Sequence, residues 1–148
     1  MLQIKKYSKS NLPSLIESDF IANFLYEHLE QYGDELVDIK AAMDYALAIN
    51  DKPGGFILTI ADNDTIYGVA VVLDTQMSGF IPEHILVYIA THAASRGKGV
   101  GRQLINRLID ECEGDIALHV DADNPARKLY ERVGFETPYL EMRLKKQK

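Results

Sequence analysis

The sequence predicts an α/β protein in which helices pack on the faces of one mixed β-sheet. Residues 85–90, ILVYIA, form a continuous apolar run, which is typical of a strand covered on both faces. Residues 56–61 and 66–73 are apolar runs joined by turn residues, as in a β-hairpin. From residue 100 onward, apolar side chains recur at helical spacing. Together these patterns favour a sheet with helical crossovers.

The first half of the chain is expected to form a strand at residues 2–7, two helices and the hairpin. Residues 14–32 carry an apolar stripe at helical spacing, and Gly33 ends this segment. Asp34 can cap a second helix, whose apolar residues from Leu36 to Leu47 again follow helical spacing. The KPGG run at residues 52–55 ends that helix before the hairpin begins.

The second half is expected to alternate strands and helices. A helix begins at Val100 and stops at Gly114, and a strand follows at residues 116–120. Asn124 and Pro125 open another helix, which Gly134 closes in the left-handed conformation. Residues 137–144, TPYLEMRL, are expected to form a final strand. The predicted order of elements is therefore β-α-α-β-β-β-α-β-α-β.

Length and composition are those of an ordinary globular protein. The 148 residues predict a single domain over residues 1–148, with 47% apolar and 26% charged residues. The lone Cys112 excludes an internal disulfide, and its place on an apolar helical face predicts a buried thiol. The start of the chain is too polar for a signal peptide and no apolar run reaches about 20 residues, so a cytoplasmic location is expected.

Charge is unevenly distributed along the chain. The net charge of −6 argues against nucleic-acid binding. Residues 11–51 hold nine acidic residues and one cation, Lys40, whereas residues 84–109 hold cations and no acid. This asymmetry indicates an acidic part and a basic part suited to two different ligands. The alternative is that both are solvated helix faces.

A glycine-rich stretch, SRGKGVGR, joins the predicted strand at 85–90 to the helix that begins at Val100. A helix start leaves about four unpaired N–H groups, and glycine lets an anion approach them closely. The helix dipole and the charges of Arg96, Lys98 and Arg102 favour a phosphate or pyrophosphate here. The alternative is a tight turn that packs the helix on the sheet. Neither a P-loop nor a dinucleotide fingerprint fits the spacing.

The spacing of Arg96, Gly99 and Gly101 resembles the acyl-CoA-binding loop of the GCN5-related N-acetyltransferase (GNAT) family. The run from Asp123 to Glu136, DNPARKLYERVGFE, resembles a second signature of that family, an Asn-led helix that contains Tyr and is closed by Gly-Phe. The predicted order of elements also matches over residues 2–144. The resemblance implies the GNAT acyltransferase fold.

This resemblance implies how acetyl-CoA would be bound. Backbone N–H groups from Gly97 to Gly101 would hold its pyrophosphate, and Arg96 and Arg102 would flank it. The full set of implied cofactor-binding positions is Ile89, Ala90, Thr91, Arg96, Gly97, Lys98, Gly99, Val100, Gly101, Arg102 and Asn124. Ile89 and Thr91 match strand positions whose backbone bonds the pantetheine arm. Asn124 matches its family position imperfectly, and helix capping is the alternative role.

The implied reaction is direct attack of an amine on the acetyl-CoA thioester, with backbone N–H groups near Ile89 stabilising the oxyanion. Tyr130 matches a family tyrosine that protonates the departing thiolate, although it could instead belong to the core. The strand positions where many members carry a base are Ile85 and Val87 in this chain. Glu83 and His84 are the nearest candidates, either through water or merely as strand-end residues.

The other histidines lie outside these motifs. His28 and His119 lie in amphipathic segments and are expected to be structural, whereas His92 beside the loop suits either a structural role or a pyrophosphate contact. No constellation of side chains indicates a metal site.

The acceptor follows from the resemblance and from the charge pattern together. In this fold the two N-terminal helices wall the acceptor site, and they carry the acidic excess, so a cationic amine is expected. The expected partners are acetyl-CoA and an amine acceptor, without nucleic acid or membrane, and a homodimer is the assembly considered. Two other functions stay open: a non-catalytic acyl-CoA-binding regulatory module and a binder of nucleotide phosphates.

Overall fold

The computed structural model describes residues 2–147, which divide into two compact units, one ending at Leu118 and one beginning at His119. The first unit contains β1 (Gln3–Tyr7), α1 (Leu15–His28), α2 (Leu36–Ala46), β2 (Gly55–Ala61), β3 (Ile66–Asp74), β4 (His84–Thr91), α3 (Val100–Glu111) and β5 (Ile116–Leu118). Short 3₁₀ turns lie at Glu30–Tyr32, Ile49–Asp51 and Ala93–Ser95. The second unit contains α4 (Arg127–Val133).

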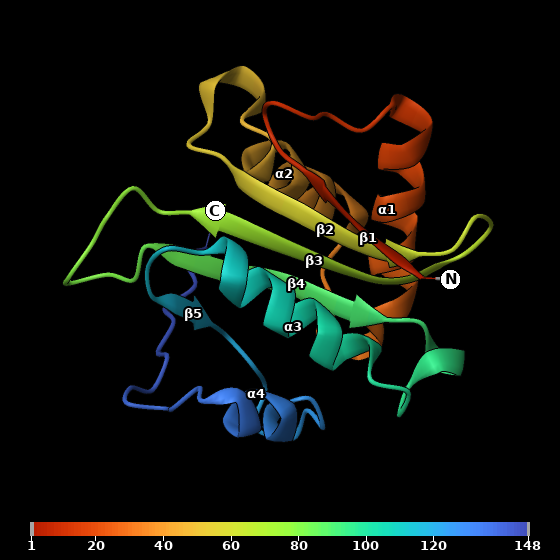
Figure 1. Cartoon of the computed structure of the whole chain (residues 1–148). Coiled ribbons are helices and arrows are strands. Elements are labelled where there is room, and N and C mark those ends of the chain that lie inside the picture. Colours follow the sequence, from red (N-terminus) through yellow and green to blue (C-terminus); the bar gives the residue numbers. More distant parts are fainter. Residues whose placement is uncertain (1, 148) are drawn as a thin grey trace. The chain divides into compact units, whose positions relative to one another are not determined.

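The five strands form one mixed sheet in the order β1-β2-β3-β4-β5 (Figure 1). Neighbouring strands are antiparallel from β1 to β4, and β5 lies parallel to β4. The parallel pair is connected by α3, as parallel strands require a crossover. This architecture confirms the predicted α/β fold class and the hairpin of β2 and β3.

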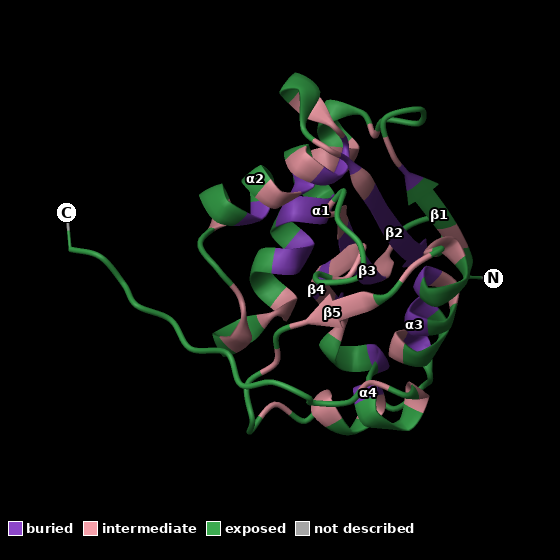
Figure 2. Cartoon of the chain, turned by 90° about the vertical axis from the view of Figure 1, so that its left-hand side faces the viewer, coloured by how far each residue is buried: buried purple, intermediate pink, exposed green. Residues whose placement is uncertain are grey.

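The two faces of the sheet are covered by different helices. Tyr7, Ile57, Val69 and Tyr88 belong to the core cluster that also contains the buried side chains of α1 and α2. In Figure 2 the buried parts of these two helices are purple. On the opposite face α3 packs so closely on β3 that a Cβ at Gly68 would lie 2.7 Å from Leu104 Cδ1. Glycine at this position therefore permits the close approach of helix and strand.

The start of α1 is fixed by hydrogen bonds that also reach β1. The Glu17 amide donates to Ser14 Oγ (3.0 Å), and the Ser14 amide donates to Glu17 Oε1 (2.9 Å). This reciprocal pair is a capping box. Tyr7 Oη of β1 donates to the other carboxylate oxygen of Glu17 at 3.0 Å. Hydrogen bonds from the Ser14 amide and from Tyr7 lower the pKa of Glu17.

The helix α3 ends at the chain's lone cysteine. Its buried side chains are Val100, Leu104, Ile105 and Leu108, as the spacing predicts. Cys112 is the C-cap residue of α3 and is half-buried. Burial raises the pKa of its thiol to about 11. The thiol is therefore protonated at neutral pH. Within residues 2–147, every helix is too short or too polar to cross a bilayer.

The second unit confirms one predicted element and contradicts another. Gly134 ends α4 with φ +114°, and the Phe135 amide donates to the Tyr130 carbonyl at 3.0 Å, as expected. The final strand predicted at residues 137–144 is wrong, because this segment pairs with no strand among the described residues. Its apolar side chains are exposed, with Leu140 at 91%. Alternating apolar residues predict a strand, but a strand also requires a neighbouring strand to pair with, which this alternation does not specify.

Removing the α1 cap tests the link between β1 and α1. We expect Ser14→Ala to lower the free energy of unfolding by about 1 kcal/mol, because the Glu17 amide loses its acceptor. In a chain of this length, this corresponds to a fall in Tm of about 2–4 °C. Ser18→Ala, within the same helix and away from the cap, is the matched control and should leave Tm unchanged or slightly raised. Equal Tm values for the two variants would contradict the capping role.

Candidate active site

The glycine-rich loop between β4 and α3 adopts a conformation that demands glycine. Gly97 and Gly99 have φ values of +84° and +83°, in the left-handed region. A Cβ at either residue would meet no atom within 4 Å. The glycines are therefore required by the backbone conformation and leave open space beside it, rather than relieving crowding between helix and sheet. This geometry speaks against the tight-packing alternative.

The same loop presents amide groups that have no acceptor within the described residues. The Lys98 amide donates to the Ser95 carbonyl at 3.2 Å, and the Gln103 amide donates to the Gly99 carbonyl at 3.0 Å. Across residues 2–147, no acceptor pairs with the amides of Gly97, Gly99, Val100, Gly101 and Arg102. These groups lie at the start of α3, where the helix dipole also favours negative charge. The loop therefore presents unpaired donors at a helix start, an arrangement that suits an anion.

The three cations of the loop differ in their partners. Arg96 forms an ion pair with Glu30 (3.0 Å), and its guanidinium donates to the His28 carbonyl at 3.2 Å. Lys98 and Arg102 are exposed and form no ion pair with the described residues. Arg96 thus ties the loop to the end of α1, while Lys98 and Arg102 leave uncompensated positive charge beside the amide groups.

Two histidines stack next to this loop. The His28 and His92 ring centroids lie 4.6 Å apart, and Phe24 packs on His28 with a centroid distance of 4.5 Å. His92 Nδ1 accepts a hydrogen bond from the Ala94 amide and so caps the 3₁₀ turn at Ala93–Ser95. Burial lowers the pKa of His28, which favours its neutral form. The expectation that His28 is structural therefore agrees with its packing, and His92 holds the turn before the loop.

Strand β4 has one partly unpaired edge. It pairs with β5 only at His84, Ile85 and Leu86, and then continues alone on this edge to Thr91. The other edge pairs with β3 as far as Thr91. The free edge exposes peptide groups that an extended ligand can bond in the manner of an added strand.

The hydrogen-bond pattern indicates which residues face the free edge. The His92 amide donates to the Tyr67 carbonyl at 2.8 Å, toward β3. Peptide groups alternate between the two edges of a strand, so Ala90 also faces β3, whereas Ile89 and Thr91 face the free edge. Ala90 is buried in the core on the α1 and α2 face. Of the three strand residues predicted to bind the cofactor, Ile89 and Thr91 have suitably directed backbone groups.

A β-bulge interrupts the pairing of β3 and β4 beside this edge. Val71 pairs with Tyr88 and Val72 with Leu86, which leaves Val87 as the extra residue. Bulges re-aim neighbouring groups and are frequent next to active sites. No sequence signal predicts it, because Val87 continues an unbroken apolar run.

Tyr88 of β4 brings a carboxylate to the α1 and α2 face. Its hydroxyl donates a short hydrogen bond to Asp34 Oδ2. Tyr88 is buried and Asp34 is exposed, so one carboxylate oxygen is held while the group stays open to solvent. Burial and the Asp34 carboxylate raise the pKa of Tyr88. Asp34 was expected to cap α2, but the cap residue is Glu35, which makes no side-chain cap hydrogen bond, and the Asp34 carboxylate instead accepts from Tyr88.

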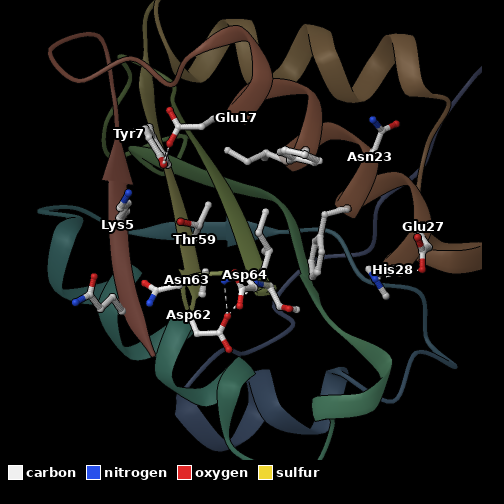
Figure 3. A pocket seen from close by; sticks show the side chains of 17 residues that line it. Lys5, Tyr7, Glu17, Asn23, Glu27, His28, Thr59, Asp62, Asn63 and Asp64 are labelled. Atoms are coloured by element: carbon white, nitrogen blue, oxygen red, sulfur yellow. Dashed lines mark hydrogen bonds and ion pairs between the residues drawn. The ribbon is translucent and has the colours of Figure 1, made fainter. Parts of the chain in front are cut away.

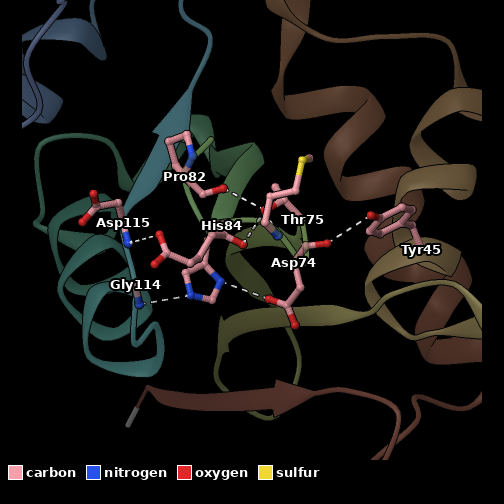
Figure 4. A network of polar contacts seen from close by, with 9 residues as sticks. Tyr45, Asp74, Thr75, Pro82, His84, Gly114 and Asp115 are labelled. Carbon is pink, nitrogen blue, oxygen red and sulfur yellow. Dashed lines mark hydrogen bonds and ion pairs between the residues drawn. The ribbon is translucent and has the colours of Figure 1, made fainter. Parts of the chain in front are cut away.

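His84, the first residue of β4, lies in a network of polar contacts (Figure 4), and Glu83 directly precedes the strand. His84 Nδ1 lies 3.0 Å from Asp74 Oδ1, and its Nε2 accepts from the Gly114 amide at 3.3 Å. Since Nε2 is an acceptor, the ring carries its proton on Nδ1. Glu83 Oε1 accepts from the Asp115 amide at 3.1 Å. Both side chains connect β4 to the loop between α3 and β5, and their catalytic roles stay predictions.

The predicted residues of the second unit lie in and before α4. Asn124 Oδ1 accepts from the Ala126 amide at 2.9 Å, in the turn before α4, whose own cap residue is Ala126 without a side-chain cap. Tyr130 is buried, and the Phe135 ring meets it edge-on with a centroid distance of 6.0 Å. Burial raises the pKa of Tyr130 to about 12, so its hydroxyl keeps its proton at neutral pH.

Comparison with known proteins places these features in a family. The model of the acetyltransferase (GNAT) family matches residues 16–135. The cysteine-rich protein 2-binding proteins of mouse and human are 39% identical to this chain over 56 residues. That match covers 37% of this chain and only 7% of those proteins, so the chain spans a small part of their length.

Solved structures share the fold over nearly the whole chain. A predicted acetyltransferase with acetyl-CoA from Clostridium acetobutylicum superposes with a TM-score of 0.67 and 16% identity, covering 97% of this chain and 96% of the other. An aminoglycoside N-acetyltransferase in complex with CoA superposes with a TM-score of 0.71 and 14% identity, covering 99% and 95%. At such identities the superpositions show the fold alone. On the family match over residues 16–135, the chain belongs to the acetyltransferase (GNAT) family.

Proposed function

We propose that this chain is an acetyl-CoA-dependent N-acetyltransferase that transfers an acetyl group to a primary amine within a ternary complex. The observation that carries the proposal is the left-handed glycine loop, whose unpaired amides adjoin the free edge of β4. Acetyl-CoA has an anionic pyrophosphate and an extended, amide-containing pantetheine arm, so these two features suit its two parts. The fold shared with proteins solved with acetyl-CoA and CoA supports this assignment.

In this proposal each part of the loop has a separate task. The unpaired amides of Gly97, Gly99, Val100 and Gly101 bind the pyrophosphate, with the side chains of Lys98 and Arg102 supplying charge. Arg96 positions the loop through Glu30 and the end of α1 rather than acting as a free cation. Ile89 and Thr91 offer backbone groups to the pantetheine arm.

The proposed chemistry is acyl transfer without a covalent enzyme intermediate. The amine nitrogen attacks the thioester carbonyl carbon, the C–S bond breaks, and the amine loses a proton while the thiolate gains one. An amide at the free edge, such as that of Ile89, stabilises the oxyanion. Tyr130, with a pKa of about 12, is a protonated donor suited to the leaving thiolate. Deprotonating a lysine-like amine at pH 7 costs about 4–5 kcal/mol, so a water chain or a base is also required.

The proposed acceptor is a cationic amine. The segment that contains α1 and α2 holds nine acidic residues against one lysine. Asp34 adds a specific anchor, because Tyr88 of β4 holds its carboxylate on the helix-covered face of the strand that would bind the donor. An aminoglycoside, the substrate named for one protein of this fold, is itself a polycationic amine.

One observation favours a non-catalytic acyl-CoA-binding module instead. The base positions hold Ile85 and Val87, and both Glu83 and His84 are bound to the α3–β5 loop. Calorimetric titration with acetyl-CoA, CoA and ATP, followed by thiol release across an amine library, distinguishes the functions. Tight CoA binding without thiol release would support the module, and preferential ATP binding would support a nucleotide-phosphate binder.

Gly99→Glu tests the loop assignment. We expect the loss of measurable acetyl-CoA binding, because a carboxylate beside the amides repels the pyrophosphate and a side chain at φ +83° strains the loop. Gly79→Glu is the matched control, since Gly79 also has a positive φ, +74°, in a loop remote in sequence. The measurement is calorimetric titration, with circular dichroism to check folding. Unchanged acetyl-CoA affinity in Gly99→Glu would refute the assignment.

Tyr130→Phe tests the proposed general acid. We expect kcat to fall by about 10²–10⁴-fold with little change in the KM for acetyl-CoA, because the variant loses a proton donor and keeps the ring. The ring contact with Phe135 is retained, so Tm should change little. Steady-state kinetics together with a thermal melt check this. A folded variant that turns over as fast as the wild type would assign Tyr130 to the core.

His84→Ala separates a structural role from a catalytic one. We expect Tm to fall by roughly 2–8 °C, since the Gly114 amide loses its acceptor, which costs about 1–2 kcal/mol. At a temperature where the variant is folded, kcat should stay within a few-fold of wild type. His119→Ala, at an exposed histidine, is the control and should leave both quantities unchanged. A loss of turnover within the range typical of a missing general base, about 10²–10⁴-fold, without a change in Tm would identify His84 as the base.

A further inference from the structure

A pocket of about 770 Å³ lies on the α1 face of the sheet (Figure 3). Strands β1 and β2 form its floor, where Gln3 pairs with Ala61 and Lys5 pairs with Thr59. Side chains of α1 form one wall, and the turn between β2 and β3, residues 62–65, closes one end. The pocket is therefore built from two strands, a helix and a turn of the first unit.

This pocket is separate from the glycine loop and from the free edge of β4. Its floor strands are β1 and β2, and β2 lies two strands away from β4. At the usual spacing of neighbouring strands, this is roughly 10 Å across the sheet. A ligand here would leave the proposed donor site unoccupied.

The pocket is strongly acidic. Its lining includes four carboxylates, those of Glu17, Glu27, Asp62 and Asp64, against one lysine, Lys5. Hydrogen bonds from the Asp64 and Thr65 amides lower the pKa of Asp62, and the capping box does the same for Glu17. Burial lowers the pKa of the lining residue His28, so it adds no charge at neutral pH. The lining is therefore negatively charged.

The floor of the pocket contains a hydroxyl group that has no hydrogen-bond partner in the described part of the protein. Thr59 lines the pocket, and only 5% of its surface is exposed. Its hydroxyl takes part in none of the side-chain hydrogen bonds of residues 2–147. Every fully buried side-chain polar atom among the described residues has a hydrogen-bond partner. The Thr59 hydroxyl has none, so it is not fully buried and reaches solvent through the pocket that Thr59 lines. A hydroxyl without a protein partner, on a residue this buried, favours a ligand that can donate to it.

The arrangement of charge selects the kind of cation. The described residues contain no group of three or more metal-ligating side chains, so the carboxylates are too dispersed for a single metal ion. Glu17 and Glu27 are ten residues apart on α1, which is about 15 Å along the helix axis. Between them lie apolar side chains, among them Phe20, Ile21 and Phe24. This pattern suits a flexible ligand whose positive charges are separated by methylene groups.

We propose that the pocket formed by β1, β2, α1 and the β2–β3 turn binds an aliphatic polyamine. The ammonium groups pair with the dispersed carboxylates, the methylene segments cover the apolar side chains, and one N–H donates to the Thr59 hydroxyl. The pocket is a binding site distinct from the site of acetyl transfer, and polyamine binding does not depend on acyl-CoA.

The experiment is calorimetric titration of the full chain with spermidine at low salt, without acyl-CoA. We expect saturable binding that weakens as NaCl is added, and no binding of 1,8-octanediol, a neutral chain of comparable length. Thr59→Val should weaken spermidine affinity about 2–10-fold, and Asp64→Asn about 2–5-fold. Asp110→Asn, an exposed acid on α3, is the matched control and should not change it.

Two further variants keep the outcome decisive. Gly99→Glu, designed to abolish acetyl-CoA binding, should retain full spermidine affinity; its loss would place the polyamine in the donor site and overturn the proposal. If Thr59→Val does not fold, Glu27→Gln combined with Asp64→Asn carries the test, since neither residue is buried. The proposal is also overturned by the absence of saturable spermidine binding, or by unchanged affinity in this double variant.

Discussion

The central constraint on this structure is that strand β4 must pair its backbone on both edges, yet β5 accompanies it for only three residues. From Val87 to Thr91, β4 has β3 beside one edge, and no strand among the described residues lies beside its other edge. Buried peptide groups without partners are costly, so such an edge persists where water or a ligand completes it. The early end of β5 and the glycine loop that follows β4 thus leave unpaired peptide groups along one continuous segment, where the proposed acyl-CoA donor would bind.

Helix α1 connects the elements around this device. At its start, Glu17 joins Tyr7 of β1, and at its end the His28 carbonyl accepts from Arg96 of the loop. The inner face of α1 packs on the sheet, and Ile21 and Phe24 of this face also line the acidic pocket. One helix therefore borders both the proposed donor loop and the proposed polyamine pocket, and its two ends are fixed to different segments of the chain.

Much of the fold follows from the sequence, because the patterns that specify it are local. The helix at Val100 and the hairpin of β2 and β3 were predictable from periodicity and turn residues. The prediction of a final strand was wrong for the opposite reason, since residues 137–144 have the alternation of a strand but lack a pairing partner in the described structure.

The site was less predictable, because its details depend on contacts between distant residues. The bond from Tyr88 to Asp34 joins residues 54 positions apart, and the bulge at Val87 arises from pairing register. The same holds for the partners that bind His84 and Arg96. The residue types of the loop indicate an anion site, but only the fold shows which of its cations are already paired.

The position of Cys112 has a practical consequence for enzymology. It is the chain's one cysteine, and the raised pKa of its thiol keeps it largely protonated at pH 8. Disulfide dyes react with thiolates, so they titrate this protein slowly while reacting rapidly with free CoA. A colorimetric reading of CoA release therefore starts from a low and steady protein background, and it does so without mutation of the cysteine.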